Sequence, residues 1–320
     1  MKEKTIYQNH ALLGFIRKNS VILTGLLLLC GFLSIVTDSF LTNGNIMSLL
    51  RQISTNALLT LGMMMCIIIG GIDLGLGAYI ALSGTVTAVM ITNYGVNIPV
   101  SILLGLLSGA LCGLISGVFI AYVKVPAFIA TMAMMNVARG AASLATNANP
   151  VRVTIPAFTN LGIGRIGSIP LPVFYVVFWI IVMALFLNKT RMGRYIYAVG
   201  GNQNAARYSG ISIKTVQITV HIFSGFLAAF AGIVLAARMY SGQPAVAQGY
   251  EMDAVAASVL GGISLTGGSG DVFSAMIGVL IIGVLNNGLN LLNVNTFWQL
   301  IAKGVVILFA VSFDMIRNRN

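Results

Sequence analysis

Long apolar runs separated by short polar passages dominate this chain. A membrane-spanning helix needs about 20 mostly apolar residues, whereas a strand of a membrane barrel alternates apolar and polar positions over about 10 residues. Continuous apolar runs such as residues 21–29 do not alternate. The pattern therefore predicts an all-α, polytopic membrane protein with about 8–10 transmembrane helices in one domain, residues 1–320. The expected segments are residues 21–36, 46–69, 74–91, 100–123, 127–144, 171–187, 216–236, 254–260, 272–292 and 297–313.

Two glycine-rich passages interrupt this pattern, GGIDLGLG at residues 70–77 and GGISLTGGSGD at residues 261–271. Glycine costs about 1 kcal/mol inside a helix, so we expect each passage to break one. Interrupted apolar segments in corresponding positions are typical of transport pathways. We expect Asp73 to cap the helix that follows the first break, and the alternative is that Asp73 lines a polar pathway.

The passages between the apolar segments differ in their expected roles. Residues 37–45 and the longer, Asn- and Pro-rich residues 145–170 are predicted to be external loops. Small residues at four-residue intervals, which let a second helix approach closely, occur at Gly105, Gly109, Gly113 and Gly117. We expect this stripe to pack against another helix.

Composition agrees with a membrane location and bears on topology. Of the 320 residues, 58% are hydrophobic and only 8% are charged, and the net charge is +11. The basic residues are spread over short loops rather than gathered in a basic domain, so a nucleic-acid partner is not expected. The positive-inside rule places both termini and the basic residues 189–214 in the cytoplasm. The three cysteines lie in apolar segments without metal-ligand spacing, so we expect no disulfide and no metal site.

Residues 189–214 form the longest basic and polar passage between apolar segments. Within it, Asn202 is expected to cap a short helix over residues 203–209, because asparagine is a strong N-cap residue. Gly210 is expected to end that helix in a left-handed conformation. A short helix exposed to water or to a partner is therefore predicted at the cytoplasmic face.

Uncharged amides cluster near the end of the chain. They are costly in a membrane unless they bond to neighbouring helices or line water, and both interpretations stay open. The translocation-pathway candidates are Asp73, Asn136, Asn286, Asn287, Asn290, Trp298 and Gln299.

No sequence motif of a common enzyme is found. The chain lacks G-x-x-x-x-G-K-[ST], a nucleophile elbow and H-E-x-x-H, so we expect no catalytic residues and no ATP bound by this chain in the usual way. An ion-driven symporter or channel stays an alternative, although its ionisable candidates are scattered along the sequence: Asp73, Arg139, His221 and Lys303. For His221, a bond between helices is expected rather than a proton relay.

Several motifs together resemble the membrane permease of ribose-type sugar ABC importers. They are GGIDLGLG, AFIATMAMMNVARG (residues 127–140), GRYIYAVGGNQNAARYSGI (193–211), GYEMDAVAASVLGGISLTGG (249–268) and LNNGLNLL (285–292). Taken together, in this order and at these spacings, the motifs span essentially the whole chain. The resemblance implies a permease subunit that carries ribose or a related monosaccharide into the cytoplasm by alternating access.

The resemblance also implies partners. These are an ATPase subunit that holds ATP and Mg²⁺, an extracytoplasmic sugar-binding protein, a second permease copy and the lipid of a bacterial inner membrane. The coupling helix that docks the ATPase is implied at Gly201, Asn202, Ala205, Ala206, Arg207, Ser209, Gly210 and Ile211.

Overall fold

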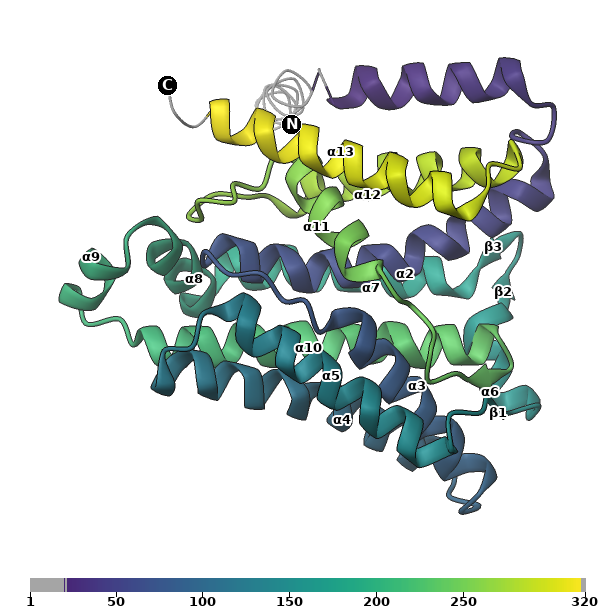
Figure 1. Ribbon diagram of the computed structural model, residues 1–320, viewed down its shortest axis with the longest axis horizontal. Helices are drawn as coiled ribbons and strands as arrows, with labels where there is room; N and C mark the ends of the chain where they lie inside the picture. Colours follow the sequence, from purple (N-terminus) through teal and green to yellow (C-terminus); the bar gives the residue numbers. More distant parts are fainter. Residues whose placement is uncertain (1–19, 21, 318–320) are drawn as a thin grey trace, which may run out of the picture.

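The structure is a computed structural model that describes residue 20 and residues 22–317 (Figure 1). Some of the basic residues used to predict the orientation of the termini lie outside this part of the chain, namely Lys2, Lys4, Arg17, Lys18 and Arg319. The described residues form a bundle of long helices that lie side by side. Short helices and strands cover the two ends of the bundle.

The first half of the chain is helical almost throughout. A helix over Ile22–Val36 is followed by α2 (Asn43–Ile68) and α3 (Leu76–Thr92). Next come α4 (Ile98–Val118), which continues as the π-helical turn η1 (Phe119–Val123), and α5 (Ala127–Thr146).

The predicted loop at residues 145–170 carries small elements of its own. They are β1 (Val151–Arg152), α6 (Pro156–Ile163), β2 (Arg165–Ile166) and β3 (Ile169–Pro170). β2 pairs with β3, and β1 pairs with the distant β4 (Ser241–Gly242), both antiparallel. These elements gather at one end of the bundle (Figure 1).

The second half contains the remaining helices, and short ones alternate with long ones. They are α7 (Leu171–Lys189), α8 (Arg191–Gly201), α9 (Gln203–Tyr208), α10 (Ile213–Arg238), α11 (Tyr250–Leu260), α12 (Val272–Leu291) and α13 (Thr296–Arg317). α8 and α9 lie at the end of the bundle opposite the strands (Figure 1).

The all-α, polytopic architecture is confirmed. Within the described residues, five helices are long and apolar enough to cross a membrane: Ile98–Val123, Ala127–Thr146, Leu171–Lys189, Ile213–Arg238 and Val272–Leu291. Shorter apolar helices cover Ile22–Val36, Leu76–Thr92 and Thr296–Phe309. The total of about 8–10 crossings stays a prediction.

Both glycine breaks are present, and the first one differs from expectation in a detail. α2 ends before Gly70, whose φ of 81° suits glycine. The prediction that Asp73 caps α3 is wrong, because α3 begins at Leu76 with Gly75 as its N-cap residue. Asp73 instead accepts the N–H of Gly75 through Oδ1 at 3.0 Å and the hydroxyl of Ser224 on α10 through Oδ2 at 2.9 Å. The Asp73 carboxylate bonds an N–H within its own turn, so it is not available to cap α3.

α10 is the central helix, and it packs against α2, α3 and α4. The predicted glycine stripe of α4 forms the closest of these contacts. A Cβ placed on Gly113 would overlap the carbonyl oxygen of His221, and one placed on Gly225 would overlap the carbonyl oxygen of Gly109. The two backbones therefore touch directly, as the four-residue spacing predicted.

We predict that Gly113→Ala lowers the stability of the purified protein. Alanine normally favours a helix over glycine, but here its methyl group meets backbone atoms that cannot rotate away. Overpacking of this kind costs about 1–3 kcal/mol. The matched control is Gly140→Ala on α5, where nothing lies within 4 Å of the added Cβ. Thermal unfolding in detergent should show a lower midpoint for Gly113→Ala only, and equal midpoints would contradict the contact.

Candidate functional site

The basic passage between α7 and α10 folds into two helices, not one. Thr190 ends α7 and caps α8 by accepting the N–H of Gly193 through its hydroxyl at 3.0 Å. The first of these helices, α8, was not predicted from the sequence. The signal was present, because Gly193, Ile196 and Val199 recur at three-residue spacing and are all buried on one face.

The short exposed helix was predicted correctly and is α9. Asn202 caps it by accepting the N–H of Ala205 at 2.9 Å, and Gly210 follows it with a φ of 80°. Of the α9 residues, only Ala206 is buried. The helix is thus held at both ends by its own chain and presents most of its surface outward.

α8 connects this helix to both glycine breaks at a contact that we call the glycine junction, formed by Gly200, Ile68, Gly267 and Gly268. The N–H of Gly268 donates to the carbonyl of Ile68 at 2.8 Å. A Cβ on Gly200 would overlap that same carbonyl oxygen and lie 2.6 Å from the nitrogen of Gly268. The end of α2, the end of α8 and the second break therefore meet at a single point of backbone contact.

A tyrosine strengthens the same connection. The hydroxyl of Tyr197 on α8 donates to the carbonyl of Gly270 in the second break at 2.9 Å. Burial, and then the nearby carboxylate of Asp271, raises the pKa of the Tyr197 phenol. The phenol therefore stays protonated and remains a donor over a wide pH range.

A cavity of about 420 Å³ lies between α9 and the first glycine break. Its lining includes the backbone of Gly70 and Gly71 and three basic side chains, Lys124, Arg207 and Lys214. His221, fully buried, also lines it. The bond recorded for His221, between Nδ1 and the carbonyl of Gln217 at 2.8 Å, stays within α10 and does not join two helices as expected.

The predicted pathway residues fall into separate places. Asp73 is fully buried between the first break and α10, and its two oxygens have the partners described above. Asn136 is exposed on α5, which packs against α3 and α4. Trp298 on α13 is exposed as well. These three residues do not form a common lining within one subunit.

Two amides of α12, Asn287 and Asn290, bond to amides of neighbouring helices. Asn287 forms a reciprocal pair with Asn45 of α2, with amide-to-carbonyl distances of 2.8 and 3.0 Å. Asn290 accepts the side-chain amide of Gln299 on α13 at 3.0 Å. Both pairs join two helices, as one of the two interpretations left open for these amides expected.

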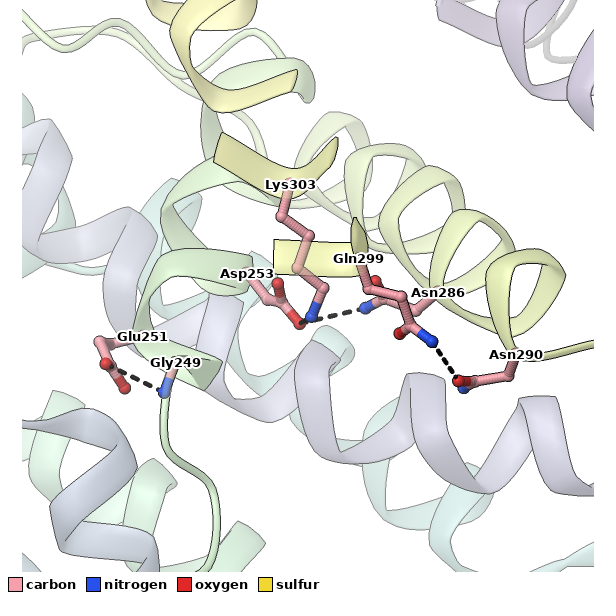
Figure 2. Close-up of polar contacts among 7 residues, drawn as sticks. All are labelled: Gly249, Glu251, Asp253, Asn286, Asn290, Gln299 and Lys303. Carbon is pink, nitrogen blue, oxygen red and sulfur yellow. Dashed lines mark hydrogen bonds and ion pairs between the residues drawn. The ribbon is translucent and has the colours of Figure 1, made fainter. Parts of the chain in front are cut away.

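Asn286 belongs to a charged cluster that was not predicted from the sequence. Figure 2 shows the side chains of Lys303 and Asn286 converging on Asp253. Both donate to the same oxygen, Oδ2, at 3.0 Å from Lys303 and 3.1 Å from Asn286. We call these three residues the Asp253 cluster. It joins α11, α12 and α13.

α11 begins at Tyr250 with Gly249 as its N-cap residue, so Glu251 and Asp253 lie inside its first turn and not before a helix that starts at residue 254, as expected. Glu251 accepts the N–H of Gly249 at 3.2 Å and points away from the Asp253 cluster (Figure 2). Asp253 faces α12 and α13 instead. Lys303 is 50 positions away in sequence, so no local spacing could have revealed the pair.

Another basic side chain considered as unpaired, Arg139 of α5, is held by backbone. Its Nη1 donates to the carbonyls of Pro244 and Val246 at 3.1 and 2.6 Å. Burial of this guanidinium is thus offset by carbonyl acceptors. Arg139 fixes the segment that leads from β4 to α11.

Comparison with known proteins identifies relatives over nearly the whole chain. The ribose import permease protein RbsC of Escherichia coli (strain K12) is 44% identical over 296 residues, covering 91% of this chain and 92% of the relative. RbsC of Bacillus subtilis (strain 168) is 45% identical over 292 residues, covering 91% and 90%. The L-arabinose ABC transporter permease protein AraH of Azospirillum brasilense is 36% identical over 292 residues, covering 91% and 86%.

No solved structure matches the chain. The family described as branched-chain amino acid transport system / permease component matches residues 45–311, which include both glycine breaks, α8, α9 and the Asp253 cluster. This chain therefore belongs to that family of transport permeases and is a multi-pass membrane subunit rather than an enzyme.

Proposed function

We propose that this chain is the permease subunit of an ATP-driven importer that carries ribose or a closely related monosaccharide into the cytoplasm across a bacterial inner membrane. The names of the relatives supply the substrate class. The observation that supports the mechanism is the glycine junction, because it connects the exposed helix α9, through α8, to both breaks in the apolar segments.

In this mechanism a separate ATPase subunit docks on α9 and holds the ATP and Mg²⁺, so the permease needs no cofactor of its own. Movement of α9 shifts α8, and the shift reaches the end of α2 at Ile68 and the second break at Gly268. Backbone contact at Gly200 leaves no compressible side chain to absorb the displacement. The breaks then change the packing of the helices around the path, which is alternating access.

The two ends of the bundle face different partners in this proposal. The end with α8 and α9 faces the cytoplasm in this proposal, and α13 runs toward that same end (Figure 1). The opposite end, with α6 and the short strands, receives the sugar-binding protein. A second permease copy and membrane lipid cover the exposed apolar helix faces, for example those of α4 and α7.

Reconstitution tests the function directly. Vesicles that contain the permease together with its ATPase should take up radiolabelled ribose when ATP is inside and the loaded binding protein is outside. Omitting the ATPase, the ATP or the binding protein should abolish uptake. Uptake that needs only an ion gradient would contradict the proposal and favour the symporter alternative.

We predict that Gly210→Val uncouples ATP hydrolysis from ribose uptake. The φ of 80° at this position is strained for a β-branched residue. Nothing lies within 4 Å of an added Cβ, so the substitution acts through backbone conformation and not through a steric clash. Asparagine tolerates a left-handed conformation, and Gly210→Asn is the matched control. The measurement is ribose transported per ATP hydrolysed. Equal ratios for the two variants would argue against a role for the α9 terminus.

Gly200→Ala should also lower the ratio of ribose transported to ATP hydrolysed, because its methyl group overlaps the carbonyl of Ile68 and separates α8 from both breaks. ATPase binding, measured by co-purification, should persist since α9 itself is unchanged. Gly140→Ala, which meets no neighbour, should transport like the wild type. A normal ratio in Gly200→Ala would show that coupling bypasses the glycine junction.

A further inference from the structure

The Asp253 cluster occupies a distinctive place in the fold. After β4 the chain turns back from the strand-bearing end of the bundle, and α11 begins near the middle of the molecule (Figure 1). Asp253 lies in the first turn of this 11-residue helix. A helix that starts inside the apolar region presents its positive dipole end and its free N–H groups there, and such half-helices bind substrates in other transport folds.

The cluster also contains an acceptor that is left without a donor. Asn286 donates its amide to Asp253, but its Oδ1 is buried and has no hydrogen-bond partner among the described residues. Asn286 itself is 3% exposed. A buried carbonyl without a donor is costly, so the arrangement is complete only when another donor reaches Asn286.

Access to the cluster is through Lys303. The side chain of Lys303 is 26% exposed, whereas that of Asp253 is 5% exposed. The side chain of Lys303 extends from α13 to the carboxylate of Asp253 (Figure 2). Because α13 packs chiefly against α11, a shift of α13 alone would withdraw the ammonium group and uncover both Asp253 and Asn286.

We infer that Asp253, Asn286 and Lys303 form a recognition point for the hydroxyl groups of the transported sugar. This inference rests on the proposed transport function. A sugar hydroxyl both donates and accepts, and the cluster offers matching groups: a carboxylate that accepts, an ammonium that donates and an amide that does both. Sugar hydroxyls take the place of the ammonium at Asp253 and supply the missing donor to Asn286.

The neighbouring polar pair extends this surface. Asn290 lies one helical turn beyond Asn286, on the same side of α12, and it bonds Gln299 of α13. Both polar contacts therefore bridge α13 to the α11–α12 unit, and a moving α13 would open them together. Glu251 faces the other side of α11 and takes no part in the site.

A purely structural role for the ion pair makes a different prediction. If the pair only fixes α13 on α11, then exchanging the two charges preserves it, and removing Asn286 leaves it intact. If the cluster binds sugar, the exchanged pair presents the wrong group at each position and the loss of Asn286 removes a contact. The test therefore compares Asp253→Asn, Asn286→Ala and the double exchange Asp253→Lys with Lys303→Asp.

Each variant is reconstituted with the ATPase and the binding protein, and ribose uptake is measured at limiting loaded binding protein. We expect uptake to fall about tenfold or more in all three, since a buried group loses its partner. Co-purification of the ATPase with each variant reports whether the complex assembles. Asp38→Asn, which removes a carboxylate from the loop before α2, is the control that should transport normally.

Uptake restored by the charge exchange, or normal uptake in Asn286→Ala, would overturn the inference. The Asp253→Asn variant and the charge-exchange variant could fail to assemble with the ATPase. In that case ribose uptake by Asn286→Ala still tests the inference, because this variant leaves the Asp253–Lys303 pair in place. The ATP dependence of uptake by the wild type tests the proposed function separately from the sugar site. Uptake that does not depend on the ATPase would refute the proposed function, whereas ATP-dependent uptake that is unaffected in Asn286→Ala refutes only the sugar site.

Discussion

Direct contact between backbones at glycine positions is the constraint on which the rest of this structure depends. Between helices in a bilayer the hydrophobic effect gives little driving force, so close packing and interhelical bonds must hold the bundle together. The α4–α10 contact provides the close packing at Gly113 and Gly225, and the glycine junction repeats it at Gly200. In the proposed mechanism, the same close backbone contact lets the junction transmit a displacement from α8 to the glycine breaks.

Several charged side chains of the interior are held by partners from distant segments. Asp73 is bonded by Ser224 of α10, Arg139 by carbonyls before α11, and Asp253 by Lys303. A charge in an apolar environment is tolerated when it is paired and hydrogen-bonded. Within the described part of the chain the Oδ1 of Asn286 has no hydrogen-bond partner, and neither have Oδ1 of Asn56 and Nε2 of His221. In the Asp253 cluster the unpaired atom belongs to a residue that also bonds an ion pair.

The sequence predicted the local features well, because local chemistry determines them. The cap at Asn202, the left-handed Gly210 and the glycine breaks each depend on neighbouring residues. The spacing of the α4 glycines predicted a packing face, but not that α10 is the helix that packs on it. Asp73 was misplaced because its second oxygen bonds a residue 151 positions away. The junction and the Asp253 cluster could not be predicted at all, since both need knowledge of which distant segments meet.

The reciprocal amide pair of Asn45 and Asn287 has a consequence for biogenesis. These side chains are 242 positions apart, near the beginning and the end of the chain. During synthesis the side-chain carbonyl of Asn45 therefore lacks this donor until α12 has emerged from the ribosome. The bond that ties the start of α2 to α12 can therefore form only after most of the chain has been synthesised. It is a contact that the N-terminal helices cannot make on their own.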